Sequence, residues 1–366
     1  MRKKPVTILM ILLGAALLSA CVGGAVHGST WPGRTADGET AYLADGPLVY
    51  AINLSDGREI WRYPGDRDAS LAFYATPVVT PDGLIIVGSA GTDYPLIALD
   101  PNDINPETNA PAEVWRFAGA REPWRAAPLV VENKLFAPNA DGNLYILDLQ
   151  DGQSVKEAAV VLVGGRLWSQ PTTDGARVYI TSLDHRVAAV DVNTYDVLWQ
   201  EDLGGAVPGS AVLGEDGALY VGSLASRLER FDPATGNHQT LVEAENWVWS
   251  TPVLDGDTLY FSDVDGNFYS VDTATDNLNW SVRPDGPITA SPLIQNDHTL
   301  LATESGSLYA VDRDGKVLWT AQVGGKIYTT PVAAGDVILV APLETDFYLA
   351  ALDENGRQVW TWTPGE

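Results

Sequence analysis

The chain has 366 residues and a formal net charge of −26, because 48 Asp and Glu face only 22 Lys and Arg. A surface this acidic argues against nucleic-acid binding, since contacts to phosphate depend on clustered Lys and Arg. The chain also has a single cysteine, which excludes an intramolecular disulfide, so the fold must be held together by its hydrophobic cores.

The first 20 residues have the pattern of a secretory signal: a basic start, an apolar run over Val6–Leu18, and small residues before Cys21. The run is too short to span a bilayer comfortably. The sequence Leu-Ser-Ala-Cys that ends at Cys21 resembles the bacterial lipobox. We therefore predict a signal peptide over residues 1–20, lipidation of Cys21, and a flexible tether over residues 21–28. An ordinary signal followed by an incidental cysteine is the alternative.

A repeat occupies the rest of the chain. Its marker is an Asp or Asn that ends a short apolar run, at Asn53, Asp100, Asp148, Asp191, Asp232, Asp272, Asp312 and Asp353. Successive markers lie 40 to 48 residues apart. A tryptophan follows in six units, at Trp61, Trp115, Trp199, Trp280, Trp319 and Trp360, whereas Lys156 and Thr240 stand near that place in the third and fifth units. Self-similarity at this period is the signature of a repeat architecture.

Each unit also carries a second marker upstream, usually a Pro. These residues are Pro77, Pro128, Pro171, Pro252, Pro292 and Pro331, with Ala211 at this place in unit five and Pro32 assigned to unit one. Alternating apolar runs and Asp-Gly turns between the markers predict four short strands per unit. The sequence therefore predicts an all-β, eight-bladed β-propeller of four-stranded antiparallel blades over residues 29–366. A β-solenoid is the alternative, but its repeats are shorter.

The stretch from Ala51 to Trp61, with Asn53 and Gly57 between them, resembles the tryptophan-docking motif of the PQQ-repeat (quinoprotein-like) propellers. This family includes quinoprotein alcohol dehydrogenases and the BamB-type outer-membrane assembly lipoproteins. The resemblance implies that the six repeated tryptophans are structural and wedge their rings between neighbouring blades. It identifies the fold more specifically than the function.

Catalytic residues are not predicted. The resemblance implies that quinoprotein dehydrogenases commonly place an adjacent cysteine pair over the cofactor, and this chain has one cysteine. Its four histidines are scattered over different units or the tether, without metal-ligand spacing. The stretch Asp263–Asn267 hints at a calcium loop but lacks the third oxygen ligand before the Gly and the distal Glu of such a loop. It also matches Asn139–Asn143, so we predict a hairpin turn there. We therefore predict no catalytic residue, no cofactor and no metal.

One set of residues goes beyond packing. Three residues before the Pro marker, five units carry a large side chain: Tyr74, Arg125, Trp168, Trp249 and Tyr328. The other units carry Ser29, Pro208 and Thr289 there, and Trp124 and Trp247 lie close by in the sequence. Equivalent positions in a propeller form a ring, which should surround one mouth of the central channel. The set predicts a rim that stacks on a planar ligand, a sugar or an extended peptide, or alternatively a plug that fills the channel.

These features together predict a monomeric, membrane-anchored, non-catalytic interaction scaffold on the extracytoplasmic side of the cell envelope. The host's envelope decides between the outer membrane or periplasm and the cell surface. The resemblance implies a role in outer-membrane β-barrel assembly, with components of that machinery as protein partners. A ligand-binding module for PQQ or a sugar, and a substrate-capturing surface lipoprotein, are the alternatives.

Overall fold

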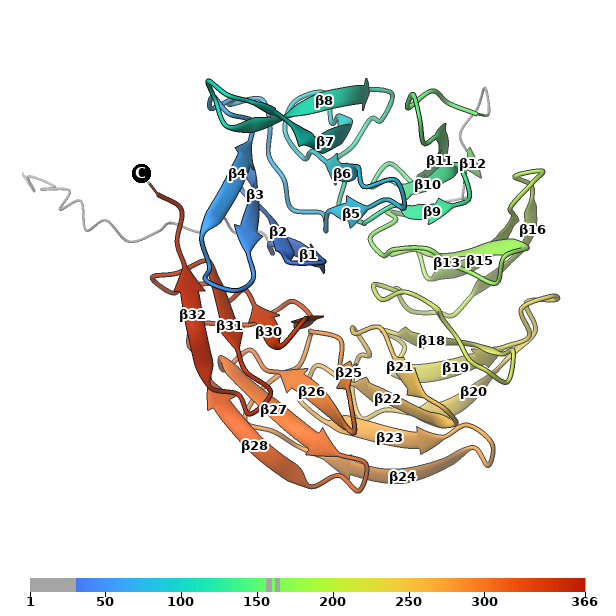
Figure 1. Cartoon of the computed structure of the whole chain (residues 1–366). Coiled ribbons are helices and arrows are strands. Elements are labelled where there is room, and N and C mark those ends of the chain that lie inside the picture. Colours follow the sequence, from blue (N-terminus) through green and yellow to red (C-terminus); the bar gives the residue numbers. More distant parts are fainter. Residues whose placement is uncertain (1–30, 156–159, 162–164, 366) are drawn as a thin grey trace, which may run out of the picture.

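The computed structural model describes residues 31–155, 160–161 and 165–365. Eight four-stranded sheets form a ring around a central channel, which confirms the predicted eight-bladed propeller (Figure 1). The predicted signal peptide, Cys21 and the tether lie outside the described residues. Within the described ranges there is no helix that is long and apolar enough to cross a membrane.

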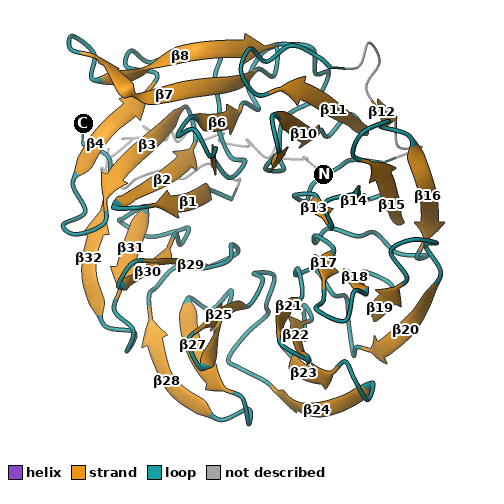
Figure 2. Ribbon diagram, turned by 45° about the vertical axis from the view of Figure 1, so that its right-hand side comes forward, coloured by secondary structure: helices purple, strands orange, loops and turns teal. Residues whose placement is uncertain are grey.

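Each blade consists of four consecutive strands, of which the first lies nearest the channel and the fourth at the outer edge (Figure 2). Blade 1 comprises β1 (Gly33–Asp37), β2 (Thr40–Asp45), β3 (Leu48–Asn53) and β4 (Glu59–Tyr63). Blade 2 comprises β5 (Val78–Val79), β6 (Ile85–Gly88), β7 (Leu96–Asn105) and β8 (Ala110–Phe117). Blade 3 comprises β9 (Leu129–Val131), β10 (Lys134–Pro138), β11 (Asn143–Asp148) and β12 (Val160–Val161). Blade 4 comprises β13 (Thr172–Thr173), β14 (Arg177–Thr181), β15 (Arg186–Asp191) and β16 (Val197–Asp202).

The second half of the ring repeats this order. Blade 5 comprises β17 (Val212–Leu213), β18 (Leu219–Ser223), β19 (Arg227–Phe231) and β20 (His238–Glu243). Blade 6 comprises β21 (Val253–Asp255), β22 (Thr258–Ser262), β23 (Phe268–Asp272) and β24 (Asn277–Val282). Blade 7 comprises β25 (Leu293–Gln295), β26 (His298–Ala302), β27 (Ser307–Asp312) and β28 (Val317–Gln322). Blade 8 comprises β29 (Val332–Ala334), β30 (Val337–Val340), β31 (Leu349–Leu352) and β32 (Gln358–Trp362).

The marker Asp or Asn holds the turn that follows the third strand in seven blades, whereas Asp100 of blade 2 lies within β7, at a register shift. In all eight blades its side-chain oxygen accepts the backbone N–H of the residue two positions later, at 2.8–3.0 Å. Asp and Asn commonly stabilise a turn in this way. This recurring turn explains why the marker could be read from the sequence.

The six docking tryptophans lie on the fourth strands, opposite a small residue of the third strand. Trp61 pairs with Ala51, and Trp199 pairs with Ala189. A register shift directly follows the residue opposite the tryptophan in all six of these blades. The small partner leaves room for the indole, and the bulge re-aims the strand end toward the next blade.

Eight hydrophobic clusters fill the eight joints between adjacent blades. Four docking tryptophans also donate an indole N–H to the next blade, at 2.8–2.9 Å: Trp115 to Leu149 O, Trp199 to Pro233 O, Trp280 to Arg313 O and Trp360 to Leu54 O. Each acceptor carbonyl belongs to the residue that follows the marker of the next blade. The indole therefore adds a directional bond to the buried area.

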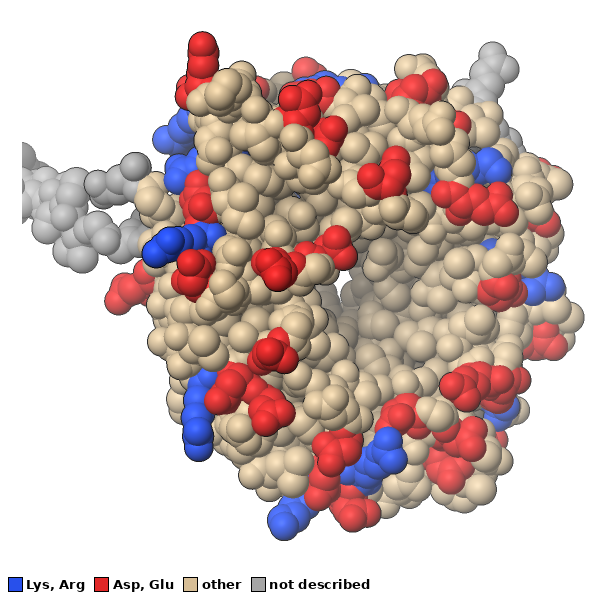
Figure 3. All heavy atoms as spheres, viewed as in Figure 1, with Lys and Arg blue, Asp and Glu red and all other residues tan. Residues whose placement is uncertain are grey.

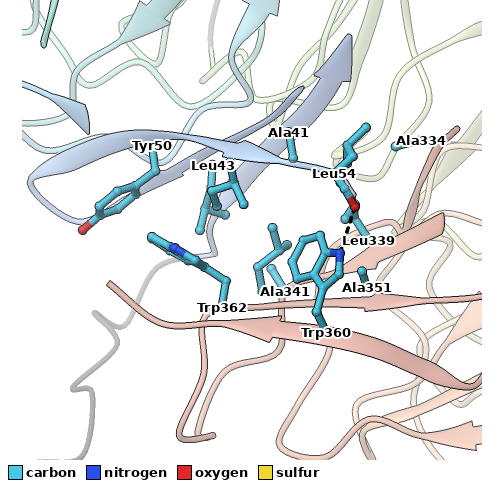
Figure 4. Close-up of a cluster of buried hydrophobic side chains, with 12 residues drawn as sticks. Ala41, Leu43, Tyr50, Leu54, Ala334, Leu339, Ala341, Ala351, Trp360 and Trp362 are labelled. Carbon is cyan, nitrogen blue, oxygen red and sulfur yellow. Dashed lines mark hydrogen bonds between the residues drawn. The ribbon is translucent and has the colours of Figure 1, made fainter. Parts of the chain in front are cut away.

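The ring closes between blade 8 and blade 1 through side chains. Both blades have four strands of their own, and among the described residues no strand is shared between them. Trp360 lies against blade 1 with its indole bonded to Leu54, and Trp362 packs edge-on to Tyr50 at 4.7 Å between ring centroids (Figure 4).

Blade 2 carries an insertion between Asp100 and Trp115. β7 and β8 both extend into it and form a longer hairpin, with a register shift between Asp100 and Ile104. Asn109 at its tip donates its side-chain N–H to the carbonyl of Ile60 in blade 1 at 2.8 Å. The insertion thus covers part of the outer strand of the neighbouring blade.

Candidate functional site at the channel mouth

All five predicted rim residues line one cavity of ≈ 990 Å³ at the mouth of the channel: Tyr74, Arg125, Trp168, Trp249 and Tyr328. Pro208 and Thr289, which hold the equivalent positions in blades 5 and 7, line the same cavity. The structure therefore places these equivalent residues around one cavity. A cavity of this size falls within the range of ligand sites.

Our assignment for unit one was wrong by two residues. In blades 6 and 8 the rim residue precedes the glycine of the first hairpin by seven positions, as Trp249 precedes Gly256 and Tyr328 precedes Gly335. The same count from Gly38, whose φ is 54°, leads to Trp31 rather than Ser29. Trp31 lines the cavity and completes a set of eight equivalent residues, which we call the rim residues.

The segments that carry the rim residues alternate between buried and accessible side chains. The residue before each rim residue in blades 2 to 8 is at most 1% exposed: Phe73, Trp124, Leu167, Val207, Val248, Ile288 and Ile327. These apolar side chains fix the segment in a joint, and the next side chain then points to the channel. Trp124 therefore belongs to the core, and Trp247, which is 52% exposed, does not line the cavity.

A belt of hydrogen bonds joins the blades just below the rim. The N–H of Ser210 donates to the Thr251 hydroxyl, that of Thr251 to the Ser291 hydroxyl, and that of Ser291 to the Thr330 hydroxyl, at 2.9–3.0 Å. These bonds link blades 5, 6, 7 and 8 in order. The belt therefore holds the rim residues of these blades at fixed spacing.

Arg34 continues the belt from blade 8 to blade 1. It stands at the position that the Pro marker occupies elsewhere, and its guanidinium donates to the carbonyl of Thr329 at 3.0 Å and to Thr330 O. It is 5% exposed, and burial lowers the pKa of this guanidinium to about 9. It stays protonated at neutral pH, so a positive charge lies in the wall of the cavity.

The aromatic rim residues do not form an even ring. Trp31 stacks on Tyr328 with 5.3 Å between ring centroids and meets Trp249 edge-on at 6.0 Å. On the other side, the Arg125 guanidinium lies 5.5 Å from the Tyr74 ring, and Trp168 is 36% exposed. The two sides of the ring of rim residues thus differ in how closely their aromatic side chains pack against one another.

The cavity walls do not offer a set of metal ligands. Glu122 is the one carboxylate among the described lining residues, and the described part of the chain contains no group of three or more His, Cys, Asp or Glu that could hold a metal ion. Asp263 instead accepts N–H bonds from Asp265 and Asn267 within its own hairpin, each at 3.0 Å. The interpretation of residues 263–267 as a hairpin turn is confirmed. The described lining of the cavity does not fit a quinone cofactor held by a divalent cation.

Comparisons with known proteins agree with this architecture. A family profile described as "Outer membrane protein assembly factor BamB" matches residues 23–240 and 292–366. BamB of Pseudomonas aeruginosa is 30% identical over 161 residues, so the match spans 39% of this chain and 42% of that protein, less than half of either.

Two solved structures share the fold. The crystal structure of BamB from Moraxella catarrhalis superposes with a TM-score of 0.66 at 19% identity, over 90% of this chain and 94% of that one. A europium-containing methanol dehydrogenase superposes with a TM-score of 0.67 at 16% identity, over 87% and 83% of the two chains. At these identities the likeness concerns the fold alone.

Proposed function

Because this chain belongs to the BamB family of outer membrane protein assembly factors, we propose that it is a non-catalytic protein-interaction scaffold in the assembly of β-barrel proteins. The observation that carries the proposal is the cavity lined by all eight rim residues. Tryptophan, tyrosine and arginine are the residues most enriched at the energetic centres of protein interfaces. The rim would hold a partner or an extended client at the channel mouth.

The proposal includes a lipid anchor at Cys21. Cys21 precedes Trp31 by ten residues, a length that spans at most about 36 Å when fully extended. The cavity would therefore lie within that distance of the membrane surface. Since the net charge is −26, attraction to anionic lipid would not hold the protein there, and acyl chains would. Replacing Cys21 with Ser should move the protein from the membrane fraction to the soluble fraction.

Site-specific crosslinking tests the scaffold role. A photoreactive p-benzoylphenylalanine at position 168 faces the cavity, whereas the same residue at position 247 lies exposed outside it. After irradiation of the native host, mass spectrometry should find β-barrel proteins or components of their assembly machinery enriched at position 168 over position 247. Equal capture at both positions, or no such protein at position 168, would contradict the proposal.

A double substitution of Trp168 and Trp249 with Ala provides the functional readout. Trp168 has no aromatic neighbour among the described residues, and Trp249 loses an edge contact to Trp31, so the melting temperature should change little. Outer-membrane β-barrel levels should fall relative to the matched Trp247→Ala variant. Global unfolding of the double variant would instead show that the ring acts as a structural plug.

A further inference from the structure

The cavity has two chemically different sides. On the side of blades 6, 8 and 1, Trp31 contacts both Trp249 and Tyr328. Tyr74, Arg125 and Trp168 line the side of blades 2 to 4, together with Arg166. On this second side the Trp168 ring is 36% exposed. Trp31 is 37% exposed as well, but it has two aromatic neighbours, whereas Trp168 has none among the described residues. We therefore call the second side the open side.

The charge of the cavity is opposite to that of the protein. Among the described lining residues, Arg34, Arg125 and Arg166 face one carboxylate, that of Glu122, while the whole chain carries a net charge of −26. Across the described residues, none of these three arginines forms an ion pair, although other arginines of the chain pair with Asp or Glu, as Arg230 does with Asp216. Figure 3 shows acidic side chains spread over the visible face around the central opening.

Unpaired cations inside a concave wall attract anions more strongly than the same cations on an open surface, because the low-dielectric walls focus the field. A guanidinium binds a carboxylate with two parallel charge-assisted hydrogen bonds. An exposed indole face such as that of Trp168 binds another ring by stacking. The open side thus combines an indole face that can stack on an aromatic ring with guanidinium groups that can bind carboxylates.

From this geometry we infer that the open side of the cavity binds an extended acidic peptide segment in which an aromatic side chain lies next to Asp or Glu. The aromatic side chain stacks on Trp168, and the neighbouring carboxylate binds Arg125 and Arg166. The stacking of Trp31 on Tyr328 shows how this ring of residues accommodates an indole. The inference rests on the proposed scaffold function and names the class of client that it selects.

Calorimetric titration of the full chain with four blocked ten-residue peptides tests this selectivity. The first peptide carries two phenylalanines and two glutamates among serine and glycine spacers. The other three replace the glutamates with glutamines, the glutamates with lysines, or the phenylalanines with leucines. The first peptide should bind tightest, and loss of its carboxylates should weaken binding roughly tenfold, since charge-assisted bonds to arginine are lost.

The lysine peptide discriminates most sharply. General attraction to a protein of charge −26 favours the lysine peptide over the glutamate peptide. Tighter binding of the lysine peptide, or equal binding of all four, would overturn the inference. The opposite order supports it, because it runs against the attraction that the net charge of the protein exerts on a cationic peptide.

Paired variants locate the binding. The double variant Arg125→Gln with Arg166→Gln, and separately Trp168→Ala, should each weaken the glutamate peptide about tenfold. Arg121→Gln and Trp247→Ala are matched controls outside the cavity lining and should leave the affinity unchanged. Equal losses in variants and controls would place the peptide elsewhere and refute the inference.

The two proposals can fail separately. If assembly components crosslink at position 168 but no peptide prefers the wild-type cavity, the scaffold function stands and the acidic-aromatic client is wrong. If the peptides bind as expected but no β-barrel protein or assembly component is captured, the recognition chemistry stands and the assembly role is wrong.

Discussion

The two joints on either side of blade 5 hold the ring together in different ways. At the joint between blades 4 and 5, Trp199 is 9% exposed and donates its indole N–H to Pro233 O at 2.8 Å. A Cβ on Gly236 would lie 2.8 Å from the indole ring, so only glycine fits beneath it. The φ of Gly236 is 77°, which also favours glycine.

The joint between blades 5 and 6 has no docking tryptophan. Gln239 pairs with Arg230, two residues before the marker, and Thr240 follows it. Arg230 donates from the neighbouring strand to Thr273 O at 3.3 Å and pairs with Asp276 at 3.3 Å. Thr273 follows its marker as Pro233 follows its own, so the arginine reaches the equivalent carbonyl. Asp276 stands at the glycine position with φ 58°, and no ring covers it.

The comparison indicates a rule for seven of the eight turns, the inserted hairpin of blade 2 being the exception. The glycines of five turns lie against the docking tryptophan of the preceding blade: Gly57, Gly152, Gly236, Gly315 and Gly356. The two turns that follow blades without the tryptophan carry Tyr195 and Asp276 at this position, with positive φ retained. Tyr195 turns its ring toward Phe136 of blade 3, at 6.3 Å between centroids. The docking indole, more than the conformation of the turn, thus requires glycine at this position.

Removing the indole ring at a joint that has a docking tryptophan should lower stability the most. Trp199→Ala should lower the free energy of unfolding by about 3–5 kcal/mol, because a buried aromatic surface and its hydrogen bond are both lost. Urea unfolding followed by circular dichroism measures the change. The exposed Trp247→Ala variant should change stability by less than about 0.5 kcal/mol. A loss at Trp199 below about 1 kcal/mol would show that the indole is not a principal contact of this joint.

Adding a methyl group beneath the ring should have the next largest effect. Gly236→Ala should destabilise by roughly 1–3 kcal/mol through overpacking and backbone strain. Asp276→Ala, at the joint without an indole, should cost at most about 1 kcal/mol because an exposed ion pair contributes little. In the double variant with Trp199→Ala, the Gly236 substitution should cost less than it does alone. Strict additivity in this cycle would argue against steric coupling.

The contacts of Arg230 at the joint between blades 5 and 6 should contribute less to stability than Trp199 does, and their contribution should depend on salt. Arg230→Met should lower stability by about 1 kcal/mol, since hydrogen bonds to Asp216, Asp276 and Thr273 are lost while apolar contacts of the stem remain. At about 1 M salt this loss should shrink. The loss caused by Trp199→Ala should not shrink under the same conditions. An unchanged Arg230 effect at high salt would show that the side chain acts through packing.

The smallest effect concerns pH and should be equal at both joints. The N–H groups of Ala234 and Thr235 hold the pKa of Asp232 below its usual value of 3.8, and those of Thr275 and Ala274 do the same for Asp272. Because the folded pKa is lowered, the stabilisation is present above pH 3.8 and is lost as the pH falls through the folded pKa.

Replacing either residue with Asn keeps the hydrogen-bond acceptor and removes the titration. Urea midpoints of Asp232→Asn and Asp272→Asn should match the parent at pH 7 and fall less steeply between about pH 5 and 3. If both variants keep the full acid sensitivity of the parent, the marker carboxylates do not contribute to it.

Most of this fold was predictable because the signals are local and repeated. The markers, the tryptophans and the Asp-Gly turns recur at nearly constant spacing, so eight blades and a ring of rim residues followed from counting. Trp31 and Arg34 were missed because unit one lacks the Pro marker and the nearby Pro32 was taken for it. Counting seven residues back from Gly38 would have found Trp31.

Other features depend on distances that the repeat does not encode. Whether Trp31 reaches Trp249, three blades away, depends on the width of the channel. The role of Arg230 was also hidden, because this residue reaches across from a third strand to a bond that tryptophans elsewhere make from a fourth strand. The hairpin formed by the insertion in blade 2 depends on a register shift between Asp100 and Ile104, and no turn residue in the sequence indicates that shift.

Because side chains close the ring between blades 8 and 1, the chain termini could be relocated to another joint by circular permutation. Elsewhere, residues 244–252 lead from the outer strand β20 to the inner strand β21. A linker of similar length from Trp362 to Gly33 would make the backbone circular, and new termini could be opened at another joint. Circular permutants of this protein should therefore fold. A lipid anchor added at the new N-terminus would then lie beneath a different blade and would tilt the cavity toward or away from the bilayer.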